Sequence, residues 1–408
     1  MRILILTQWF QPEPFLKGLC FAKELRNQGH DVHVLTGYPN YPSGKLYPGY
    51  TIKGVLRETM DGVPITRVPL YPSHNKSKIA RAANYLSFAF CAMVVGVFMR
   101  FKPDVIYAYH PPLTVDIAGC LIGFFRRVPV VVDVLDLWPD TLAASGILKN
   151  RTLLKTIGWL AQRIYRQAAA IVVPTEGYYK KFLTRGVPQK KLHLIHNWCD
   201  EEALAQRSLS QPGLLASFKG RFTVVYAGNM GPAQALFRVL DAAALLKKKR
   251  DDIQFVFVGD GLDSTALKKD ASARQLSNVS FFPQMPMNEV GHVLDAADAL
   301  LVHLRVDPLF TITIPSKTQA YLFAGKPIVM AVAGDAKSLI LRAQAGVCAV
   351  PEDPHSLVQA VESLADLSES ERVAMGKRGR LYYDENLSLK IGTRLMAAVF
   401  ASCVKRGR

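Results

Sequence analysis

The sequence lacks several features that mark well-defined classes of protein. None of its six cysteines lies at CxxC or metal-ligand spacing, so we expect free thiols in a reducing compartment. The apolar run in MRILILTQWF is too short for the apolar region of a signal peptide, and no small-residue cleavage site follows it. A cytoplasmic location is therefore expected. No nucleic-acid-binding module is recognisable, which argues against nucleic acid as a partner.

Acidic residues are also scarce. The chain of 408 residues carries a formal net charge of +17, and no Asp or Glu occurs between Gly62 and Pro103. A basic face implies an anionic partner, such as a phosphate-bearing substrate or an acidic membrane. Half of the residues are hydrophobic, which indicates packed globular structure, and the length favours two domains.

Short runs rich in Val, Ile and Phe alternate with helix-length sequence along the whole chain. The first run, RILILT, is followed by a predicted helix that ends at Gly29 and by a second run, DVHVLT. This spacing is typical of a βαβ unit with parallel strands. A second series begins after a polar stretch near residues 208–220. We therefore predict two Rossmann-like, doubly wound α/β domains facing a cleft, 1–205 and 206–384, followed by a helix over 385–408.

The loops that follow these strands are the candidate binding regions, because ligands of open parallel sheets bind at the carboxyl ends of the strands. The loop GYPNYPSGKLYPGY follows DVHVLT and combines proline, glycine and tyrosine. Its tyrosine rings would suit a sugar face or a lipid-borne substrate, whereas the alternative is a rigid surface loop. The candidate residues of this loop are Tyr38, Tyr41, Lys45 and Tyr47.

Several motifs, each placed after a strand, together resemble one family. In chain order they are TQWFQPEPFLKG, TGYPNYPSGKLYPGY, HPPL, DLWPDTLAASG, YAGNMGPAQAL, VGDG and IPSKTQAYLFAGKPIV. Each motif alone is weak. In this order they span the chain from Met1 to about Pro354 and resemble the retaining GT-B glycosyltransferases of the GT4 type. Within these, the sequence is most similar to bacterial N-acetyl-fucosamine transferases of O-antigen and capsule assembly.

The resemblance implies an activity and its partners. It implies transfer of a sugar, with retention and without a metal or other cofactor, from a UDP-sugar to a saccharide linked to a polyprenyl diphosphate. The donor would be held mainly by the second domain and the acceptor by the first, with the C-terminal helix crossing back onto the first domain. Two alternatives stay open, namely a UDP-sugar epimerase of the same architecture and a non-catalytic partner subunit.

The first candidate for the donor phosphates is the loop AGNMGPAQ. A transferase that uses no metal must stabilise the departing diphosphate with fixed hydrogen-bond donors. Gly228 and Gly231 let backbone N–H groups approach a phosphate, with Asn229 and Gln234 beside them. The resemblance implies an Arg and a Lys just beyond this loop, but here Arg238 is the nearby cation.

The second candidate is IPSKTQAYLFAG, where Ser316 can cap a helix and Lys317 can pair with phosphate; a solvated lysine is the alternative. Many relatives carry two glutamates here, at positions that correspond to Ile312 and Ala320 in this chain. Both carboxylates are missing. Asp307, in the preceding loop, is the candidate for a contact with the donor sugar.

Further positions complete the expected donor site. The resemblance implies that VGDG and PQMP flank the nucleobase, with Gly259, Asp260, Gln284 and Met285 as the contact residues. Gly18 follows the first strand, where relatives place a pair of glycines near the diphosphate.

Two side chains at strand ends are candidates for catalysis. His110, in AYHPPLT, corresponds to a histidine that contacts the donor sugar and phosphate in related transferases, although a structural hydrogen-bonding role is the alternative. Asp136, in VDVLDLWPD, is our choice for orienting the acceptor hydroxyl, with a helix cap at Asp140 as the plainer explanation.

A hydrophobic helix is predicted over Ser77–Lys102. Its central apolar run, Tyr85–Met99, has 15 residues, fewer than the roughly 20 that span a bilayer. It is either a buried core helix or a helix lying at the anionic inner surface of the cell membrane. The latter suits a lipid-linked acceptor and a peripheral location, and its candidate contacts are Lys78, Arg81, Arg100 and Lys102.

Overall fold

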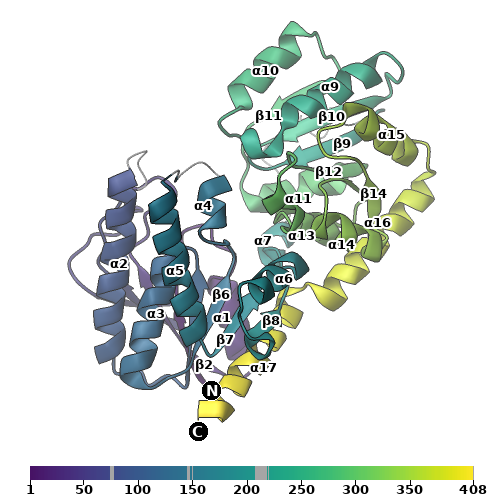
Figure 1. Cartoon of the computed structure of the whole chain (residues 1–408). Helices are drawn as coiled ribbons and strands as arrows, with labels where there is room; N and C mark the ends of the chain where they lie inside the picture. The colour runs from purple at the N-terminus through teal and green to yellow at the C-terminus, as the bar shows by residue number, and fades with distance from the viewer. Residues whose placement is uncertain (74–77, 145–147, 149, 207–217, 219, 408) are drawn as a thin grey trace. The chain divides into compact units, whose positions relative to one another are not determined.

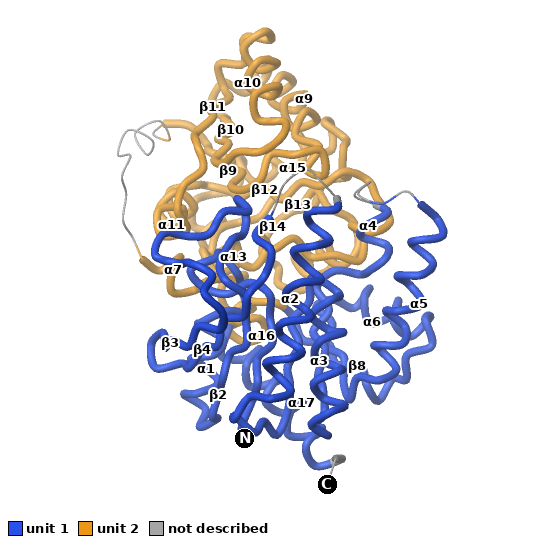
Figure 2. The backbone as a smooth tube through the Cα atoms, turned by 90° about the vertical axis from the view of Figure 1, so that its left-hand side faces the viewer, with its two compact units in different colours: residues 1–196, 389–408 blue, residues 197–388 orange. Residues whose placement is uncertain are grey.

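The computed structural model of the chain describes residues 1–73, 78–144, 148, 150–206, 218 and 220–407. These residues form two compact units, with 1–196 and 389–408 in unit 1 and 197–388 in unit 2 (Figure 1, Figure 2). Most of the polar stretch near 208–220, where we expected the domains to divide, lies outside the described residues. The chain passes from unit 1 to unit 2 before this stretch, at His196.

Unit 1 is built on an eight-stranded sheet with the strand order β3-β4-β2-β1-β5-β6-β7-β8. Neighbouring strands pair in parallel except for β3 with β4. The strands are β1 (Arg2–Leu6), β2 (Asp31–Gly37), β3 (Leu56–Met60), β4 (Val63–Val68), β5 (Val105–His110), β6 (Val130–Val134), β7 (Ala170–Val173) and β8 (Leu192–Leu194).

The strand order reverses at β1, which lies between β2 and β5. Every residue of β5 is buried, as expected for a strand covered on both faces. In doubly wound sheets a ligand binds at the carboxyl ends of the strands beside such a reversal. This places the start of the first loop, at Thr7, and the last residue of β5, His110, at the expected position of a site.

Helices of unit 1 form layers on its sheet. Helix α2 packs against α3, and α3 packs against α5, so these three helices lie side by side (Figure 1). The C-terminal helix α17 packs against α1 and β5 and therefore belongs to unit 1. The helices are α1 (Leu19–Asn27), α2 (Lys78–Phe98), α3 (Leu113–Arg126), α4 (Asp140–Ala144), α5 (Arg151–Gln167), α6 (Glu176–Thr184), the 3-10 helix η1 (Gln189–Lys191) and α17 (Leu389–Gly407).

Unit 2 is built on a six-stranded parallel sheet with the order β11-β10-β9-β12-β13-β14. The prediction of two doubly wound α/β sheets is thus confirmed. The strands are β9 (Phe222–Ala227), β10 (Ile253–Val258), β11 (Val279–Phe282), β12 (Ala299–His303), β13 (Ile328–Ala331) and β14 (Gly346–Cys348).

The core of unit 2 is formed by apolar side chains of its strands and of α9 and α15, which pack against each other. The strand order again reverses beside β9, which lies between β10 and β12. The helices are α7 (Glu201–Ala205), η2 (Pro232–Gln234), α9 (Leu236–Lys247), α10 (Ser264–Ala273), α11 (Met287–Ala296), α12 (Pro308–Thr311), α13 (Lys317–Ala324), α14 (Asp335–Ala343), α15 (Pro354–Ala365) and α16 (Glu369–Asn386).

Candidate functional site

In unit 2 the glycine loops after β9 and β10 are locked together by backbone hydrogen bonds. Gly228 N donates to Val258 O at 2.9 Å, and Met230 N donates to Asp260 O at 2.8 Å. A Cβ on Gly259 would lie 2.0 Å from the Gly228 carbonyl oxygen, so this approach requires glycine. The structure therefore brings the predicted phosphate loop and the predicted nucleobase loop to one place.

The segment after β11 joins the same cluster of loops. Gly259 N donates to Phe282 O at 3.1 Å, which ties the end of β11 to the VGDG loop. Gln284, two residues further on, is exposed and can contact a ligand. Met285 is buried and packs inward, so of these two predicted nucleobase contacts only Gln284 presents its side chain to solvent.

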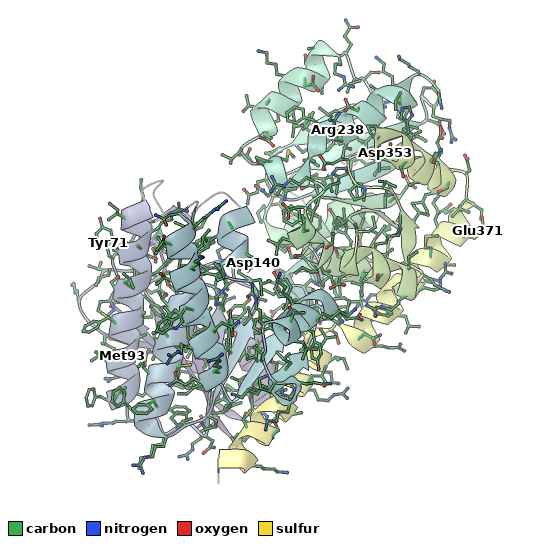
Figure 3. All side chains as sticks on the ribbon, viewed as in Figure 1. Tyr71, Met93, Asp140, Arg238, Asp353 and Glu371 are labelled. Atoms are coloured by element: carbon green, nitrogen blue, oxygen red, sulfur yellow. The ribbon has the colours of Figure 1, made fainter. Side chains whose placement is uncertain are left out.

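The polar side chains of the AGNMGPAQ loop hold the loop itself. Gln234 Oε1 accepts hydrogen bonds from Gly231 N at 3.1 Å and from Asn229 Nδ2 at 3.2 Å. These bonds shape the turn before α9, where a phosphate would approach. Arg238 lies on α9 (Figure 3) and pairs with Asp241 at 3.1 Å on the exposed side of the helix.

Lys317 begins α13 beside this loop. Its Nζ lies 3.4 Å from the centroid of the Tyr226 ring and 3.2 Å from the position of a Cβ built on Gly228. The Nζ atom is buried and has no hydrogen-bond partner among the described residues. Burial lowers the pKa of the Lys317 ammonium well below its usual range. A cation buried beside a glycine loop at a helix N-terminus is a favourable site for an anion.

The expectation that the Ser316 side chain caps α13 is wrong. Ser316 occupies the N-cap position, but its side chain makes no capping hydrogen bond, and its backbone has helical angles (φ −57°, ψ −27°). A capping side chain requires extended backbone at this position. The hydroxyl of Ser316 is thus left exposed beside Lys317.

The loop after β12 supplies a cation that the sequence analysis missed. Arg305 N donates to Ala233 O at 2.9 Å, so this loop adjoins the AGNMGPAQ loop. The Arg305 guanidinium pairs with Asp307 at 3.2 Å, and Asp307 also accepts a hydrogen bond from Leu309 N at 2.9 Å as the N-cap of α12. Asp307, predicted to contact the donor sugar, therefore already holds Arg305 and caps a helix.

Ala320, where relatives carry a glutamate, does not face these loops. It lines a cavity of about 330 Å³ between helices of unit 2. The Arg380 guanidinium at this cavity is bound by the Phe323 carbonyl at 2.8 Å. The other lining residues are Leu204, Ala205, Gly291, Leu294, Asp295, Phe323 and Ala324.

In unit 1, His110 ends β5 and pairs with a carboxylate of α3. Its Nδ1 lies 2.7 Å from Asp116 Oδ2, and both side chains are 0% exposed. The Trp138 ring packs edge-on against the imidazole, with 5.7 Å between ring centroids. Neither His110 Nε2 nor Asp116 Oδ1 has a hydrogen-bond partner in the part of the chain that the structure describes. The sequence analysis did not identify Asp116.

Two aspartates lie at the carboxyl end of β6, Asp133 within the strand and Asp136 just after it. Burial raises the pKa of Asp136, and the nearby His110 opposes this shift. Asp133 is fully buried and accepts hydrogen bonds from Tyr107 Oη and Lys17 Nζ, both at 2.5 Å. This bond to Lys17 fixes the first loop to the sheet.

Gly18 has a packing role at the N-terminus of α1. A Cβ on Gly18 would lie 2.1 Å from Gln11 Oε1, and the same oxygen accepts a hydrogen bond from Leu19 N at 2.7 Å. The N-terminus of α1 is thus occupied by the Gln11 side chain, where we expected phosphate.

Glu13 joins the first loop to the Pro/Tyr loop. Its Oε2 accepts a hydrogen bond from Phe10 N at 3.0 Å, and its Oε1 accepts bonds from Asn40 N at 2.8 Å and Tyr41 N at 2.7 Å. Burial raises the pKa of Glu13 to about 7. The sequence shows a glutamate between two prolines here, but it does not reveal these backbone partners.

The Glu13→Gln substitution is expected to lower the free energy of unfolding at pH 5 by about 1–3 kcal/mol, because a buried amide NH₂ would face the Phe10 N–H. The carboxyl pKa rises from 4.5 to about 7 on folding, so wild type but not the variant loses stability as the pH rises between these values. Urea unfolding at pH 5 and pH 8 measures both effects. The exposed Glu385→Gln is the control, and equal stability of wild type and Glu13→Gln would contradict this role.

The tyrosines of the Pro/Tyr loop have different environments. Tyr38 is buried and donates to Gly54 O at 3.1 Å, so its ring is not available for the predicted contact with a sugar or a lipid-borne substrate. Tyr47 donates to Tyr41 O at 2.9 Å, and the Tyr41 ring packs against Trp9 with 4.9 Å between centroids. Lys45 is exposed. Tyr41 and Tyr47 are half-buried, so Lys45 is the exposed member of the predicted set.

Most exposed large apolar side chains of unit 1 lie on α2, α3 and α5, which we call the apolar layer. On α2 they recur at every fourth position from Leu86 to Phe98, and Phe90 and Phe98 are 64% and 82% exposed. Met93 belongs to α2, and Tyr71, which precedes the helix, lies beside it and donates its backbone N–H to Ser87 Oγ at 2.9 Å (Figure 3). The apolar members are Ile79, Leu86, Phe90, Val94 and Phe98 of α2, Leu121, Phe124 and Phe125 of α3, and Leu153 and Trp159 of α5.

The apolar layer presents no carboxylate. Helices α2 and α5 contain no acidic residue, and Asp116, the acid of α3, is buried. The Arg163 guanidinium lies 4.8 Å from the Trp159 ring centroid. Arg100 and Lys102 follow α2 and are exposed, whereas Arg81 is half-buried. The side chain of Lys78, predicted to join this basic set, lies outside the described part of the chain.

The apolar segment of α2 is longer than the run Tyr85–Met99 that we expected from the sequence. The segment Ile79–Phe98 is long and apolar enough to cross a membrane, by length and composition alone, and only 22% of its most apolar window is buried. A helix of a protein core would be mostly buried. Helix α2 is therefore a surface helix with an apolar outer face. The segment Glu369–Lys405 is also long and apolar enough by length and composition, but 44% of its most apolar window is buried.

Within the described residues, no group of three or more His, Cys, Asp or Glu side chains is arranged to hold a metal ion.

Comparisons with known proteins agree on one family. The model "Glycosyl transferase 4-like domain" matches residues 20–198, and the model "Glycosyl transferases group 1" matches residues 212–382. The chain is 26% identical over 341 residues to "Probable glycosyltransferase WbjE" of Pseudomonas aeruginosa, covering 82% of this chain and 83% of WbjE. It is 25% identical over 411 residues to WcaI of Escherichia coli K12, covering 95% and 98%; that name describes a glycosyl transferase of colanic acid biosynthesis.

Solved structures with the same fold cover nearly the whole chain. The HepE structure from Anabaena in complex with UDP-glucose has a TM-score of 0.69 at 15% identity, covering 98% of this chain and 100% of that one. A sucrose-phosphate synthase from Thermosynechococcus elongatus has a TM-score of 0.71 at 14% identity, covering 99% of both chains. At these identities the likeness shows the fold, which is GT-B.

Proposed function

The chain belongs to the glycosyltransferases of group 1, and from this premise we propose that it moves a sugar, with retention, from a UDP-sugar to a polyprenyl-diphosphate-linked saccharide. The transferred sugar is an N-acetylated deoxyhexose of the N-acetyl-fucosamine type, and the product is a surface polysaccharide precursor. The name of WcaI, which refers to colanic acid biosynthesis, supports a role in the synthesis of a surface polysaccharide. The UDP-glucose bound to HepE supports UDP as the nucleotide of the donor.

The observation that carries this proposal is the buried Lys317 ammonium beside the glycine loops of unit 2. As the bond between sugar and diphosphate breaks, negative charge grows on the leaving UDP. Lys317, Arg305 and the N-terminus of α13 stabilise this charge without a metal. A buried cation that lacks a partner gains most from a ligand that carries the opposite charge.

In unit 1, His110 and Asp136 act on the sugar and the acceptor. His110 contacts the donor sugar through Nε2, the ring nitrogen that is not bonded to Asp116. Asp136 orients the acceptor hydroxyl, and burial raises the pKa of its carboxyl group. Lys45 of the Pro/Tyr loop is available to the acceptor diphosphate.

An assay of nucleotide release separates the candidate functions. Purified protein is incubated with each of several UDP-, GDP- and dTDP-sugars, with and without a polyprenyl-diphosphate saccharide. Release of UDP that requires the acceptor supports the proposal. Conversion of the UDP-sugar to its epimer without an acceptor would identify an epimerase instead, and no reaction with any donor would favour a non-catalytic partner subunit.

We further propose that the apolar layer rests on the anionic inner surface of the cell membrane, where a polyprenyl chain resides. Its exposed rings and aliphatic side chains suit the boundary between headgroups and acyl chains, and Arg100, Lys102 and Arg163 suit anionic headgroups. Each Lys or Arg near such a surface contributes about 1 kcal/mol. The protein is thus a cytoplasmic enzyme that is peripheral at the membrane.

Replacing Arg81, Arg100, Lys102 and Arg163 by Gln is expected to weaken binding to liposomes that contain acidic lipid by 10-fold or more, at about 1 kcal/mol for each contacting residue. Co-sedimentation with and without acidic lipid measures this. Replacing the exposed Lys248, Lys249 and Lys268 of unit 2 by Gln is the matched control and should leave binding unchanged. Equal binding by wild type and the first variant, or none by either, would refute the membrane contact.

A further inference from the structure

Asp116 is a fully buried carboxylate in the first turn of α3, and its location requires an explanation. Burying a carboxylate costs several kcal/mol unless the charge is paired. One oxygen, Oδ2, lies 2.7 Å from His110 Nδ1, and the other, Oδ1, has no hydrogen-bond partner among the described residues. The apolar sequence around it, LTVDIAGCLIGFF, would pack as well with an apolar residue at this position. The pairing with His110 is therefore the evident reason for the charge.

This pairing determines which nitrogen of His110 carries the proton. An ionised carboxylate can only accept hydrogen bonds, so Nδ1 is the donor in the contact with Asp116. Nε2 is then the atom left for another group. It is buried and lacks a partner in the described chain, and it lies at the carboxyl end of β5, beside the reversal of strand order. Buried polar atoms that lack partners are rare and often mark functional sites.

The other titratable groups around the pair do not offer a second counter-charge. Asp133 of β6 and Asp136 interact with the pair as carboxyl groups, and Cys120 of α3 and Tyr165 of α5 interact with Asp116 as neutral groups. Burial raises the pKa of Asp116, and His110 opposes this shift. His110 is thus the group that compensates the charge of Asp116.

We propose that Asp116 is a positioning residue for His110, holding the Nδ1 proton and the plane of the ring so that Nε2 meets the donor sugar in one orientation. In the neutral ring Nε2 accepts a hydrogen bond from the sugar, and in the charged ring it donates one to the diphosphate; Nδ1 keeps its proton in both. The inference rests on the proposed function, in which His110 contacts the donor. Carboxylates that orient a histidine in this way are worth about 10- to 100-fold or more in activity elsewhere.

The first test is the Asp116→Asn variant, which keeps the shape of the side chain but removes its charge. Its amide can donate to Nδ1 and so favour the opposite tautomer. We expect turnover to fall about 10- to 100-fold while the KM for the donor changes little. Thr114→Val, in the same turn of α3, is the matched control and should retain wild-type turnover. Wild-type turnover in Asp116→Asn would overturn the inference.

The second test determines which ring nitrogen of His110 carries the proton. ¹⁵N spectra of protein labelled in histidine report the tautomer of each ring, and the signals absent from His110→Asn identify those of His110. We expect protonation at Nδ1 in wild type and a shift toward Nε2 in Asp116→Asn. Spectra that are unchanged by the substitution would overturn the inference even if activity falls, because a purely structural defect leaves the tautomer unaffected.

A double-mutant comparison separates this inference from the proposed function. If Asp116 acts through His110, then Asp116→Asn should reduce turnover no further in the His110→Asn background. An equal reduction in both backgrounds would overturn the positioning role while leaving the transferase activity established. Wild-type turnover in His110→Asn would instead remove His110 from the site and reject both its contact with the donor and the positioning role of Asp116, while the transferase activity would stand. Melting temperatures recorded in parallel show whether each variant is folded.

Discussion

Replacing His110 by Ala is expected to lower turnover by about 100-fold or more, because removal of one preorganised hydrogen-bonding group at a reaction centre typically costs that much. The structure adds a second effect. Alanine leaves Asp116 buried without its partner, and breaking a buried charged pair costs about 3–5 kcal/mol. The variant should therefore also have a lower melting temperature.

His110→Asn separates the two effects. Its amide N–H can still donate to Asp116, so we expect a smaller loss of stability than in the alanine variant, with a similar loss of turnover. The measurements are the rate of acceptor-dependent UDP release and the thermal unfolding of both variants. Turnover within about threefold of wild type in a folded His110→Asn protein would place His110 outside the reaction centre, as a structural residue.

The Lys317→Met substitution is expected to weaken binding of UDP by about 10- to 100-fold, because a hydrogen bond to a charged group contributes about 1.5–3 kcal/mol. Methionine keeps an apolar stem of similar length over the Tyr226 ring. The same change should stabilise the ligand-free protein. Burial lowers the pKa of Lys317 in the folded state, so folding costs free energy at every pH below the unfolded pKa of about 10.4, and methionine removes this cost.

The pH dependence of donor binding follows from the same shift. A bound diphosphate supplies a counter-charge to the buried ammonium, so the pKa of Lys317 rises on binding and a proton is taken up. Affinity for a UDP-sugar should then fall as the pH rises above the lowered pKa of the free protein, and this slope should vanish in Lys317→Met. Titration calorimetry in two buffers of different ionisation enthalpy measures the number of protons taken up, because the heat of binding then differs between the buffers.

Arg238→Gln is the matched control for Lys317, since Arg238 is an exposed cation that is paired with Asp241 on α9. We expect it to bind UDP like wild type. If Lys317→Met bound UDP as tightly as wild type, or if Arg238→Gln weakened binding equally, the donor phosphates would not lie at α13.

The positions of the functional loops could be predicted from the sequence, whereas most of their hydrogen bonds could not. Apolar runs locate the strands, and parallel sheets bring the strand ends to one edge, so the glycines at 228 and 259 were expected near each other. The bonds of Glu13 go to backbone N–H groups of a distant loop, and every residue has such a group. The pattern of side chains in the sequence therefore cannot predict these hydrogen bonds.

Asp116 and Arg305 show what a closer reading of the sequence could have found. An acid inside the apolar stretch LTVDIAGCLIGFF must either reach solvent or find a partner, and six residues before it stands His110, at the end of a strand. Arg305 is the second residue after β12, a position equivalent to those of the predicted loops. Tyr38 was misassigned because ring exposure depends on the path of the loop, which composition does not determine.

Whether α2 lies in the core or at the surface of its unit is a question that only the structure could decide. Its composition suits a core helix and a membrane-surface helix equally well. The exposed rings of Phe90 and Phe98, and the neighbouring exposed side chains of α3 and α5, depend on which helices pack side by side. That arrangement follows from the strand order of the whole sheet.

The most direct test of the central claim is mass spectrometry of the lipid acceptor after incubation with a UDP-sugar and the purified protein. The account predicts that the polyprenyl-diphosphate saccharide gains the mass of one sugar residue, with one UDP released for each sugar added, and that Lys317→Met and His110→Asn slow this gain. An acceptor of unchanged mass, although the UDP-sugar has been consumed or converted to an epimer, would contradict it.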